Sequence, residues 1–212
     1  MTSISRRQGL VLLAALLAGC SRKAVRGQPV PPGARVLALG DSLTYGTGAA
    51  AEAAYPHVLA RLTGWDVVNA GVPGDTTAQA LARTPALLAE HRPALVLLSI
   101  GGNDLLRRQD EGVARANIER IVQAVRGGGV QLLLIAVPRP TLAARVTGSL
   151  DDHPMYAELA QAMALPLHAG GWSAVLADER LRADAIHANA AGYERFAQGL
   201  LATLRTTGLL AG

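Results

Sequence analysis

Two short polar segments of the chain carry side chains that can perform nucleophilic chemistry. In Gly40-Asp41-Ser42, the glycine allows a serine at a turn to expose its hydroxyl and its backbone N–H together. Asp184 precedes His187 by three residues, and at this spacing the carboxylate can reach Nδ1 of the imidazole and hold its tautomer. A serine that is activated by a histidine of this kind can attack carbonyl carbons, which is the chemistry of acyl transfer.

Two other segments offer groups that can stabilise a developing negative charge. Gly74 comes just before a predicted helix and offers a backbone N–H that no side chain obstructs. Asn103 follows Gly101-Gly102, which lets its carboxamide project from a loop as a hydrogen-bond donor. Backbone and carboxamide N–H groups of this kind form oxyanion holes.

Each of these segments also has a simpler structural explanation. Ser42 can cap the helix that follows it, and the glycines near position 74 can serve a turn alone. Asp104 can close an Asx-turn beside Asn103 and cap the segment after it. An Asp three residues before a His is a common pair. The arrangement of the surrounding elements must therefore decide between the two interpretations.

After its first 34 residues, the chain alternates between strand and helix patterns. Apolar runs of strand length predict strands over 35–39, 65–69, 94–100 and 130–137, with a short strand over 165–168. Helical spacing of apolar residues predicts helices over 55–63, 76–91, 113–126, 152–164 and 189–206, with a kink or break at Pro85. Strands that are buried on both faces and alternate with helices predict an α/β fold with three layers and a parallel sheet.

Ligands of such sheets bind at the carboxyl ends of the strands, which is where the polar segments lie. Ser42 follows the first predicted strand, Gly74 the second and Asn103 the third, while His187 comes just before the last helix. This ordered set resembles the SGNH, or GDSL, hydrolase superfamily. Its bacterial periplasmic thioesterase I/lysophospholipase/arylesterase group shares the motifs L-x-L-G-D-S-L, V-V-N-A-x-x-x-G-D-T, L-A-R-x-P-A-L-L, G-G-N-D and D-x-I-H-x-N. The resemblance spans roughly residues 35–206.

The resemblance implies a flavodoxin-like αβα sandwich around a mostly parallel five-stranded sheet. It also implies that Ser42, Asp184 and His187 are the catalytic triad, and that Ser42, Gly74 and Asn103 form the oxyanion hole. The expected reaction is hydrolysis of lysophospholipids, short or medium acyl esters or thioesters through an acyl-enzyme, with no metal or cofactor. The alternatives are a carbohydrate O-acetylesterase of the same superfamily and a non-catalytic surface lipoprotein.

The sequence departs from the family pattern at several positions near the site. Ala188 replaces the proline that usually follows the histidine, which predicts a slightly looser loop. Pro73 replaces a small polar residue, and Gly71 is a rival to Gly74 as an oxyanion donor. The segment 138–150, which helps to bound the acyl pocket in the family, matches poorly.

The first 20 residues have the pattern of an export signal. Arg6 and Arg7 precede an apolar run over 10–18, which is far shorter than the roughly 20 residues that span a bilayer. The following Leu-Ala-Gly-Cys resembles the lipobox of bacterial lipoproteins, which implies cleavage before Cys20 and lipidation of this residue. An ordinary signal with an incidental Cys is the alternative. We expect a signal over 1–19, a lipidated flexible tether over 20–34 and a hydrolase domain over 35–212.

Charge and composition limit the classes of partner. Six of the 20 basic residues lie in the first 35 positions, where no acid occurs, and the rest of the chain has a net charge of −2. With aromatic residues at only 3%, the domain shows no nucleic-acid surface. A single cysteine excludes an intramolecular disulfide and a Cys-rich zinc site. We expect a monomer that is anchored at the periplasmic face of the outer membrane, with a soluble periplasmic or secreted protein as the alternative.

Overall fold

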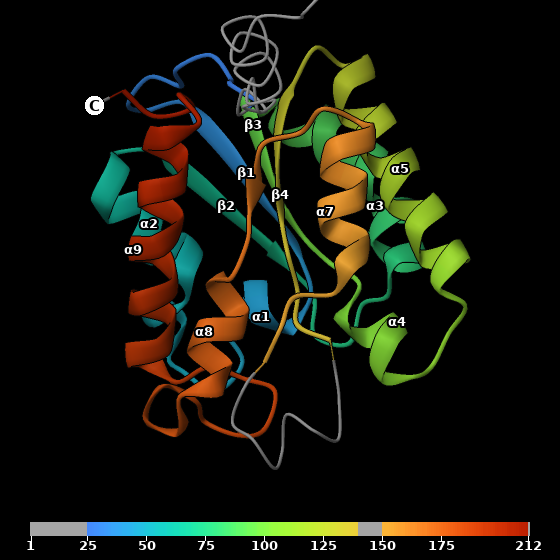
Figure 1. Cartoon of the computed structure of the whole chain (residues 1–212). Coiled ribbons are helices and arrows are strands. Elements are labelled where there is room, and N and C mark those ends of the chain that lie inside the picture. The colour runs from blue at the N-terminus through green and yellow to red at the C-terminus, as the bar shows by residue number, and fades with distance from the viewer. Residues whose placement is uncertain (1–24, 140–149, 212) are drawn as a thin grey trace, which may run out of the picture.

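A parallel sheet forms the centre of the molecule. The computed structural model describes residues 25–139 and 150–211 (Figure 1). Within these residues the sheet has five strands in the order β2-β1-β3-β4-β5, and every pair of neighbours is parallel, which confirms the predicted α/β sandwich. The strands are β1 (Arg35–Gly40), β2 (Asp66–Gly71), β3 (Leu95–Ser99), β4 (Gln131–Ile135) and β5 (Leu167–His168).

The central strands are apolar throughout because both of their faces are covered. In β1, Val36 and Ala38 belong to one hydrophobic cluster, whereas Leu37 and Leu39 belong to a second cluster on the opposite face. This alternation follows from the two-residue period of a strand. In a sheet with only one buried face, every second side chain would be polar.

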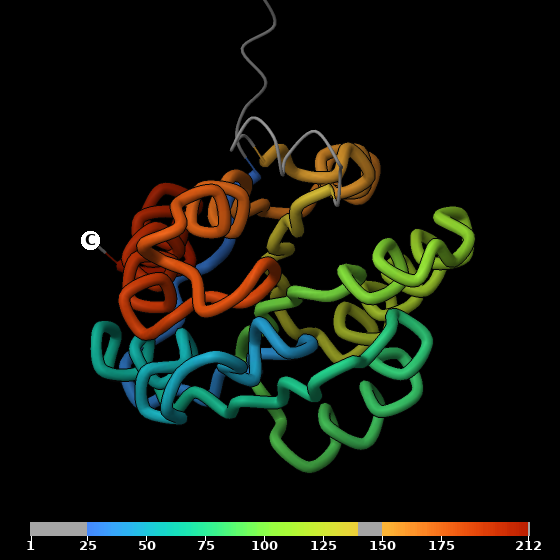
Figure 2. Tube along the Cα trace, turned by 90° about the horizontal axis from the view of Figure 1, so that it is seen from below, coloured from blue at the N-terminus to red at the C-terminus, as the bar shows by residue number. Residues whose placement is uncertain are grey.

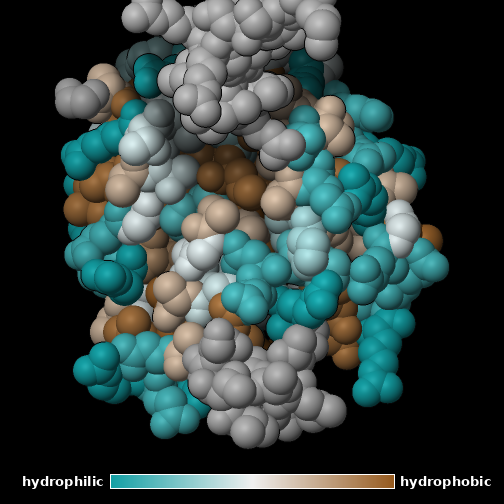
Figure 3. Space-filling model, viewed as in Figure 1, coloured by the Kyte–Doolittle hydropathy of each residue, from teal (hydrophilic) through white to brown (hydrophobic). Residues whose placement is uncertain are grey.

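Two sets of helices cover the two faces, as Figures 1 and 2 show from different directions. One face packs against α2 (Tyr55–Thr63), α8 (Gly171–Ala177) and α9 (Ala190–Thr206). The other face packs against α3 (Thr77–His91), α5 (Glu111–Gly127) and α7 (Pro154–Ala162). Hydrophilic side chains dominate the surface over α5 and α7 in Figure 3, so these helices turn their apolar sides to the sheet. Short helices complete the described part: α1 (Ser42–Tyr45), α4 (Gly102–Leu106), and the 3₁₀ turns Ala51–Ala53 and Glu179–Leu181.

The helix boundaries agree with the predicted ones apart from a few local differences. Thr76 and Gln79 form a capping box at the start of α3, and this helix runs on through Pro85 without a break. Helix α7 begins two residues later than predicted, because His153 is its N-cap and Asp152 binds the backbone N–H of Gly170 instead.

The folded part begins earlier than the predicted boundary near Arg35. The backbone N–H of Gly27 donates to the carbonyl of Thr207 at 2.8 Å, and Val30 is only 3% exposed. The segment from Gly27 to Ala34 is therefore docked on the domain and is not a flexible tether. The predicted signal, Cys20 and most of the segment 138–150 lie outside the described residues.

Candidate active site

The first three strands end level with one another, and this alignment defines the site. Gly40 at the end of β1 pairs with Gly71 of β2 on one side and with Ser99 of β3 on the other. The segments that follow these strands therefore meet at a single edge of the sheet, from which Figure 2 views the molecule. This catalytic edge, the carboxyl ends of β1, β2 and β3 with the loops that follow them, carries the predicted polar residues.

Ser42, His187 and Asp184 form a continuous hydrogen-bonded chain at this edge. The Oγ of Ser42 lies 3.0 Å from Nε2 of His187, although 145 residues separate them along the chain. Nδ1 of His187 lies 2.8 Å from Oδ2 of Asp184. With the carboxylate accepting from Nδ1–H, the Nε2 lone pair faces the serine hydroxyl, which is the tautomer that a general base needs.

Hydrogen bonds between Asp184 and the backbone hold the loop that carries His187. Oδ1 of Asp184 accepts from the backbone N–H groups of Ile186 at 2.8 Å and His187 at 2.9 Å. Partial burial acts to raise the pKa of Asp184, but the hydrogen bonds from the imidazole and from these N–H groups prevail and hold the pKa below its ordinary value. Asp184 is therefore a carboxylate at neutral pH and can accept from Nδ1–H of His187.

The replacement of proline by Ala188 leaves this loop well held. Ala188 is fully buried and pairs with Arg182 in an isolated antiparallel bridge. The next residue, Asn189, caps α9 through Gly192 and donates from its side chain to the carbonyl of Arg180 at 2.8 Å. The predicted looseness of the loop is therefore not seen in its contacts.

The buried carboxyl group of Asp41 supports the loop that carries Ser42. Asp41 is 3% exposed, and its Oδ1 accepts from the backbone N–H of Leu43 at 3.1 Å as the N-cap of α1. Burial raises the pKa of Asp41 to about 7, although the hydrogen bond from Leu43 and the nearby imidazole of His187 oppose the shift. The simpler interpretation, in which Ser42 caps the helix, is therefore wrong: Asp41 is the cap, and Ser42 is the first residue of α1 with its Oγ facing the histidine.

Three donors are available for an oxyanion. The backbone N–H groups of Ser42 and Gly74 make no hydrogen bond to any described residue. Nδ2 of Asn103 donates one hydrogen to the carbonyl of Asp75 at 2.9 Å and keeps its second hydrogen for a ligand. Gly74 has a φ of 84°, the left-handed conformation that favours glycine.

The rival glycine is excluded by its contacts. The N–H of Gly71 donates to Oδ1 of Asn69 at 3.0 Å, so it cannot serve an oxyanion. A side chain at position 71 would collide with the backbone of Tyr45, which explains the glycine by packing. Asn69 also donates to the carbonyl of Tyr45 at 3.2 Å and thereby joins the end of α1 to β2.

Arg83 is a positioning residue that the sequence reasoning left without a role. From α3 its guanidinium donates to Oδ2 of Asp75 at 2.7 Å, to the carbonyl of Ala70 at 2.7 Å and to the carbonyl of Gly40 at 2.8 Å. Gly40 precedes the serine loop, and Asp75 follows Gly74. The motif L-A-R contains this arginine, but nothing in the sequence pattern alone indicates its three partners.

Asp104 ties the asparagine loop to the start of α3. Its carboxylate accepts from the backbone N–H of Thr77 at 2.9 Å and from the Thr77 hydroxyl at 2.6 Å, and Asn117 supports the same hydroxyl at 3.1 Å. Asp104 was predicted to cap the segment that follows it in the chain. Its carboxylate instead binds the first residue of α3. This contact sets Asn103 beside the loop of Gly74.

Among the described residues, none of the other histidines or tryptophans forms a hydrogen bond with Ser42, His187 or Asp184. His168 is buried with its Nδ1 2.7 Å from Oγ1 of Thr203, and burial lowers its pKa to about 4. His153 caps α7, and Trp172 stacks on Phe196 with a centroid distance of 3.6 Å. No group of three His, Cys, Asp or Glu residues within the described ranges could hold a metal ion. In the same ranges no helix is long and apolar enough to cross a bilayer.

Solved structures share this fold. The crystal structure of TesA superimposes with a TM-score of 0.73 at 28% identity, covering 82% of this chain and 99% of that one. AlinE4, described as an SGNH-hydrolase family esterase, gives a TM-score of 0.55 at 30% identity over 65% of this chain and 76% of its own. The fold is therefore that of SGNH-type hydrolases.

A model of the GDSL-like lipase/acylhydrolase family matches residues 38–195, and the chain belongs to this family. Esterase TesA of Pseudomonas aeruginosa is 36% identical over 132 residues, which are 60% of this chain and 65% of that protein. Thioesterase 1/protease 1/lysophospholipase L1 of Escherichia coli K12 is 37% identical over 136 residues, 62% of this chain and 64% of that protein. The matched regions thus span less than two thirds of either relative.

Proposed function

We propose that this protein hydrolyses carboxylic esters or thioesters through an acyl-enzyme on Ser42. The observation that carries the proposal is the chain from Ser42 Oγ to His187 Nε2, at 3.0 Å, and from His187 Nδ1 to Asp184, at 2.8 Å. In this geometry Nε2 takes the hydroxyl proton as Oγ attacks the carbonyl carbon. The free N–H groups of Ser42, Gly74 and Asn103 then stabilise the negative oxygen.

The rest of the cycle uses the same groups. His187 returns its proton to the leaving alcohol or thiol, which breaks the scissile bond and leaves the acyl group on Ser42. Water then enters, His187 takes one of its protons, and the hydroxide oxygen attacks the acyl carbon. The proton returns to Oγ of Ser42 as the acid departs, so the enzyme is restored without any cofactor.

The surroundings of the site favour an apolar acyl group over an acetylated sugar. Among the described residues, four of the large apolar side chains that are exposed lie on the segments carrying the site: Tyr45 at 55%, Leu106 at 45%, and Val72 and Ile186 at 42% each. Leu106, Val72 and Ile186 can contact an alkyl chain but offer a sugar no hydrogen bonds from their side chains. The names of the relatives, which describe an esterase, a thioesterase and a lysophospholipase, agree with this class of substrate.

Hydrolysis of a p-nitrophenyl ester series from acetyl to palmitoyl by the full chain in detergent tests the proposal. Wild type is expected to cleave these esters, and Ser42→Ala is expected to lose at least about 10³-fold in rate, since the nucleophile is removed. Equal inactivity of both proteins across the series would refute the enzyme hypothesis. A strong preference for acetylated sugars over all acyl esters would favour the O-acetylesterase.

For the location, we infer an exported lipoprotein with Cys20 as its acylated N-terminus. The apolar run over 10–18 and the Leu-Ala-Gly-Cys segment support this proposal, and Ser21 favours the periplasmic face of the outer membrane. Mass spectrometry of the mature N-terminus tests it. A chain that begins elsewhere, or an unmodified Cys20, would contradict it.

A further inference from the structure

The docked segment Gly27–Ala34 leaves little free chain between Cys20 and the domain. Val30 donates from its backbone N–H to the carbonyl of Leu209 at 2.9 Å, and its side chain is buried in the same hydrophobic cluster as Trp65. Gly27 donates to Thr207 at 2.8 Å, so the docking begins at residue 27. The sequence places only six residues between Cys20 and this point.

The segment contacts the amino-terminal ends of two strands as well as the end of α9. Trp65 donates from its indole N–H to the carbonyl of Val30 at 3.2 Å, directly before β2 begins. Gln131, the first residue of β4, accepts from the N–H of Gln28 at 2.6 Å and donates to its carbonyl at 2.9 Å. The docked segment thus occupies the pole opposite the catalytic edge, which lies at the carboxyl ends.

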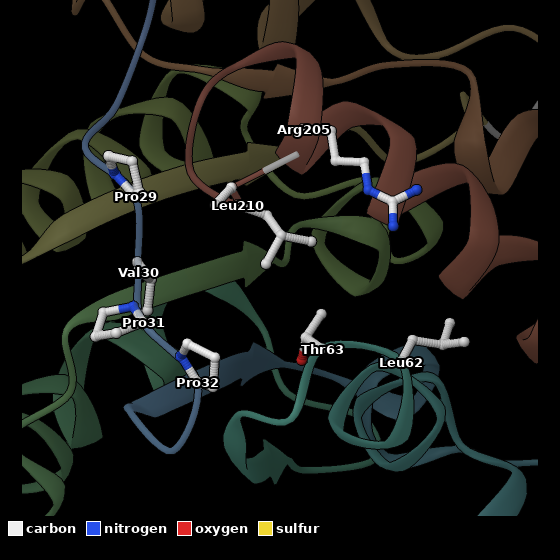
Figure 4. A pocket seen from close by; sticks show the side chains of 9 residues that line it. Pro29, Val30, Pro31, Pro32, Leu62, Thr63, Arg205 and Leu210 are labelled. Atoms are coloured by element: carbon white, nitrogen blue, oxygen red, sulfur yellow. The ribbon is translucent and has the colours of Figure 1, made fainter.

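Side chains at this pole form a shallow, mostly apolar surface. Figure 4 shows Pro29, Pro31 and Pro32 on one side of a cavity of about 550 Å³, with Leu62 and Arg205 among the residues that complete it. Leu62 is 42% exposed, and the exposed Arg205 and Arg26 carry positive charge here. Cationic side chains of this kind are attracted by anionic lipid headgroups.

The linker from Cys20 to Gly27 is no longer than the distance between the two poles. Helix α9 begins beside the His187 loop and runs for 17 residues to the pole that holds Gly27, which is about 25 Å at 1.5 Å per residue. The seven links from Cys20 to Gly27 reach about 25 Å only when fully extended. Because the chain would also have to pass around the body of the domain, this length is too short to turn the catalytic edge toward the membrane.

We propose that the anchored protein holds its catalytic edge away from the membrane that carries Cys20. This inference rests on the proposed lipidation, and its consequence rests on the proposed hydrolase activity. The enzyme then acts on acyl esters or lysophospholipids that reach it from the aqueous space or from an opposing surface. The lipids of its own bilayer are poor substrates because Ser42 does not face them.

Resonance energy transfer from a dye on the full lipidated protein to acceptor lipids in the bilayer tests this orientation. The lipid occupies the sulfur of Cys20, the only natural cysteine, so a cysteine introduced by Leu62→Cys or by Leu106→Cys is the only thiol that a maleimide dye can label. These positions are similarly exposed, at 42% and 45%, and lie at the pole and at the catalytic edge. With acceptor lipids in phosphatidylethanolamine–phosphatidylglycerol vesicles, transfer is expected to be severalfold stronger from position 62. Equal transfer, or stronger transfer from position 106, would overturn the proposal.

A variant with a longer linker between Cys20 and the domain provides a second test and leaves the domain itself unchanged. Insertion of 40 Gly/Ser residues between Arg26 and Gly27 adds a coil with an end-to-end distance of about 35 Å. The difference between the two dye positions should then shrink, and cleavage of a bilayer-resident fluorogenic ester should rise relative to that of a soluble ester. If the difference in energy transfer between positions 62 and 106 stayed the same, the short linker could not be the cause of the orientation. A chain without lipid on Cys20 would refute the anchor and the orientation together, whereas an oriented but inactive chain would refute only the hydrolase.

Discussion

Nε of Arg83 donates to Oδ2 of Asp75 at 2.7 Å, in an ion pair that is largely shielded from water. Through its other nitrogens the same guanidinium holds the carbonyls of Gly40 and Ala70. Arg83 thus joins the loop that presents Ser42 to the loop that presents the Gly74 N–H. The two loops come from different strands and need such a link to keep one geometry.

Replacement of Arg83 by glutamine is therefore expected to impair turnover more than substrate binding. A displacement of about 1 Å between nucleophile and oxyanion donors costs about 10²-fold, so kcat should fall by about this factor while KM changes little. Steady-state kinetics on p-nitrophenyl butyrate measures both constants. Arg115→Gln, which removes a surface arginine paired with Glu158, is the matched control and should keep wild-type kinetics. A raised KM with unchanged kcat would contradict the positioning role.

Loss of the carboxamide donor is expected to slow the chemical step. Asn103→Ala removes one donor of the proposed oxyanion hole, so kcat should fall by about 10²–10³-fold. The thermal unfolding midpoint of the variant checks that the contact with Asp75 was not structurally essential. Gln123→Ala, an exposed change on α5, serves as the control. Wild-type kcat in Asn103→Ala would remove this residue from the proposed machinery.

Asp184→Asn is expected to reduce kcat by about 10⁴-fold, because an amide favours the wrong tautomer of the histidine. The pKa of Asp184 is held below its ordinary value by its hydrogen bonds, so its charge is present at neutral and mildly acidic pH. The kcat–pH profile of wild type should then show no separate acidic step from Asp184 above pH 4. Asp178→Asn, an aspartate that pairs with Arg180, should leave kcat unchanged. A comparable loss in that control would argue against a specific role.

Asp41 makes the free energy of unfolding depend on pH in a defined direction. Its pKa rises from 3.8 to about 7 on folding because of burial, so the folded state binds the proton more tightly than the unfolded state. The stabilisation is present in full below about pH 4 and is lost as the pH rises through 7. Asp41→Asn keeps an N-cap acceptor and should remove this loss.

Urea unfolding at several pH values between 4 and 8 measures the effect of Asp41. Wild type should become less stable toward pH 8 relative to Asp41→Asn, whereas the exposed control Asp66→Asn should follow the wild-type trend. Parallel curves for wild type and Asp41→Asn would show that the carboxyl group does not titrate as the burial implies.

Local patterns of residues were sufficient to predict the α/β fold and to place the candidate residues after strands. Val36 to Leu39 are continuously apolar because both faces of a central parallel strand are buried, and that run is visible in the sequence. The same reasoning places Ser42, Gly74 and Asn103 after successive strands. The structure brings these residues together with His187 and Asp184, while their catalytic roles remain predictions.

The sequence by itself therefore determined the layers, the edge and the types of residue that meet there, because the periods of strands and helices are local properties of the chain. Only the tertiary structure decided that Gly74 and not Gly71 keeps a free N–H, and that Arg83 joins three segments. It also decided that residues 27–34 dock on the domain, at the pole opposite Ser42. These outcomes depend on contacts between residues far apart in the chain, such as Val30 and Leu209, whose packing and register no local pattern records.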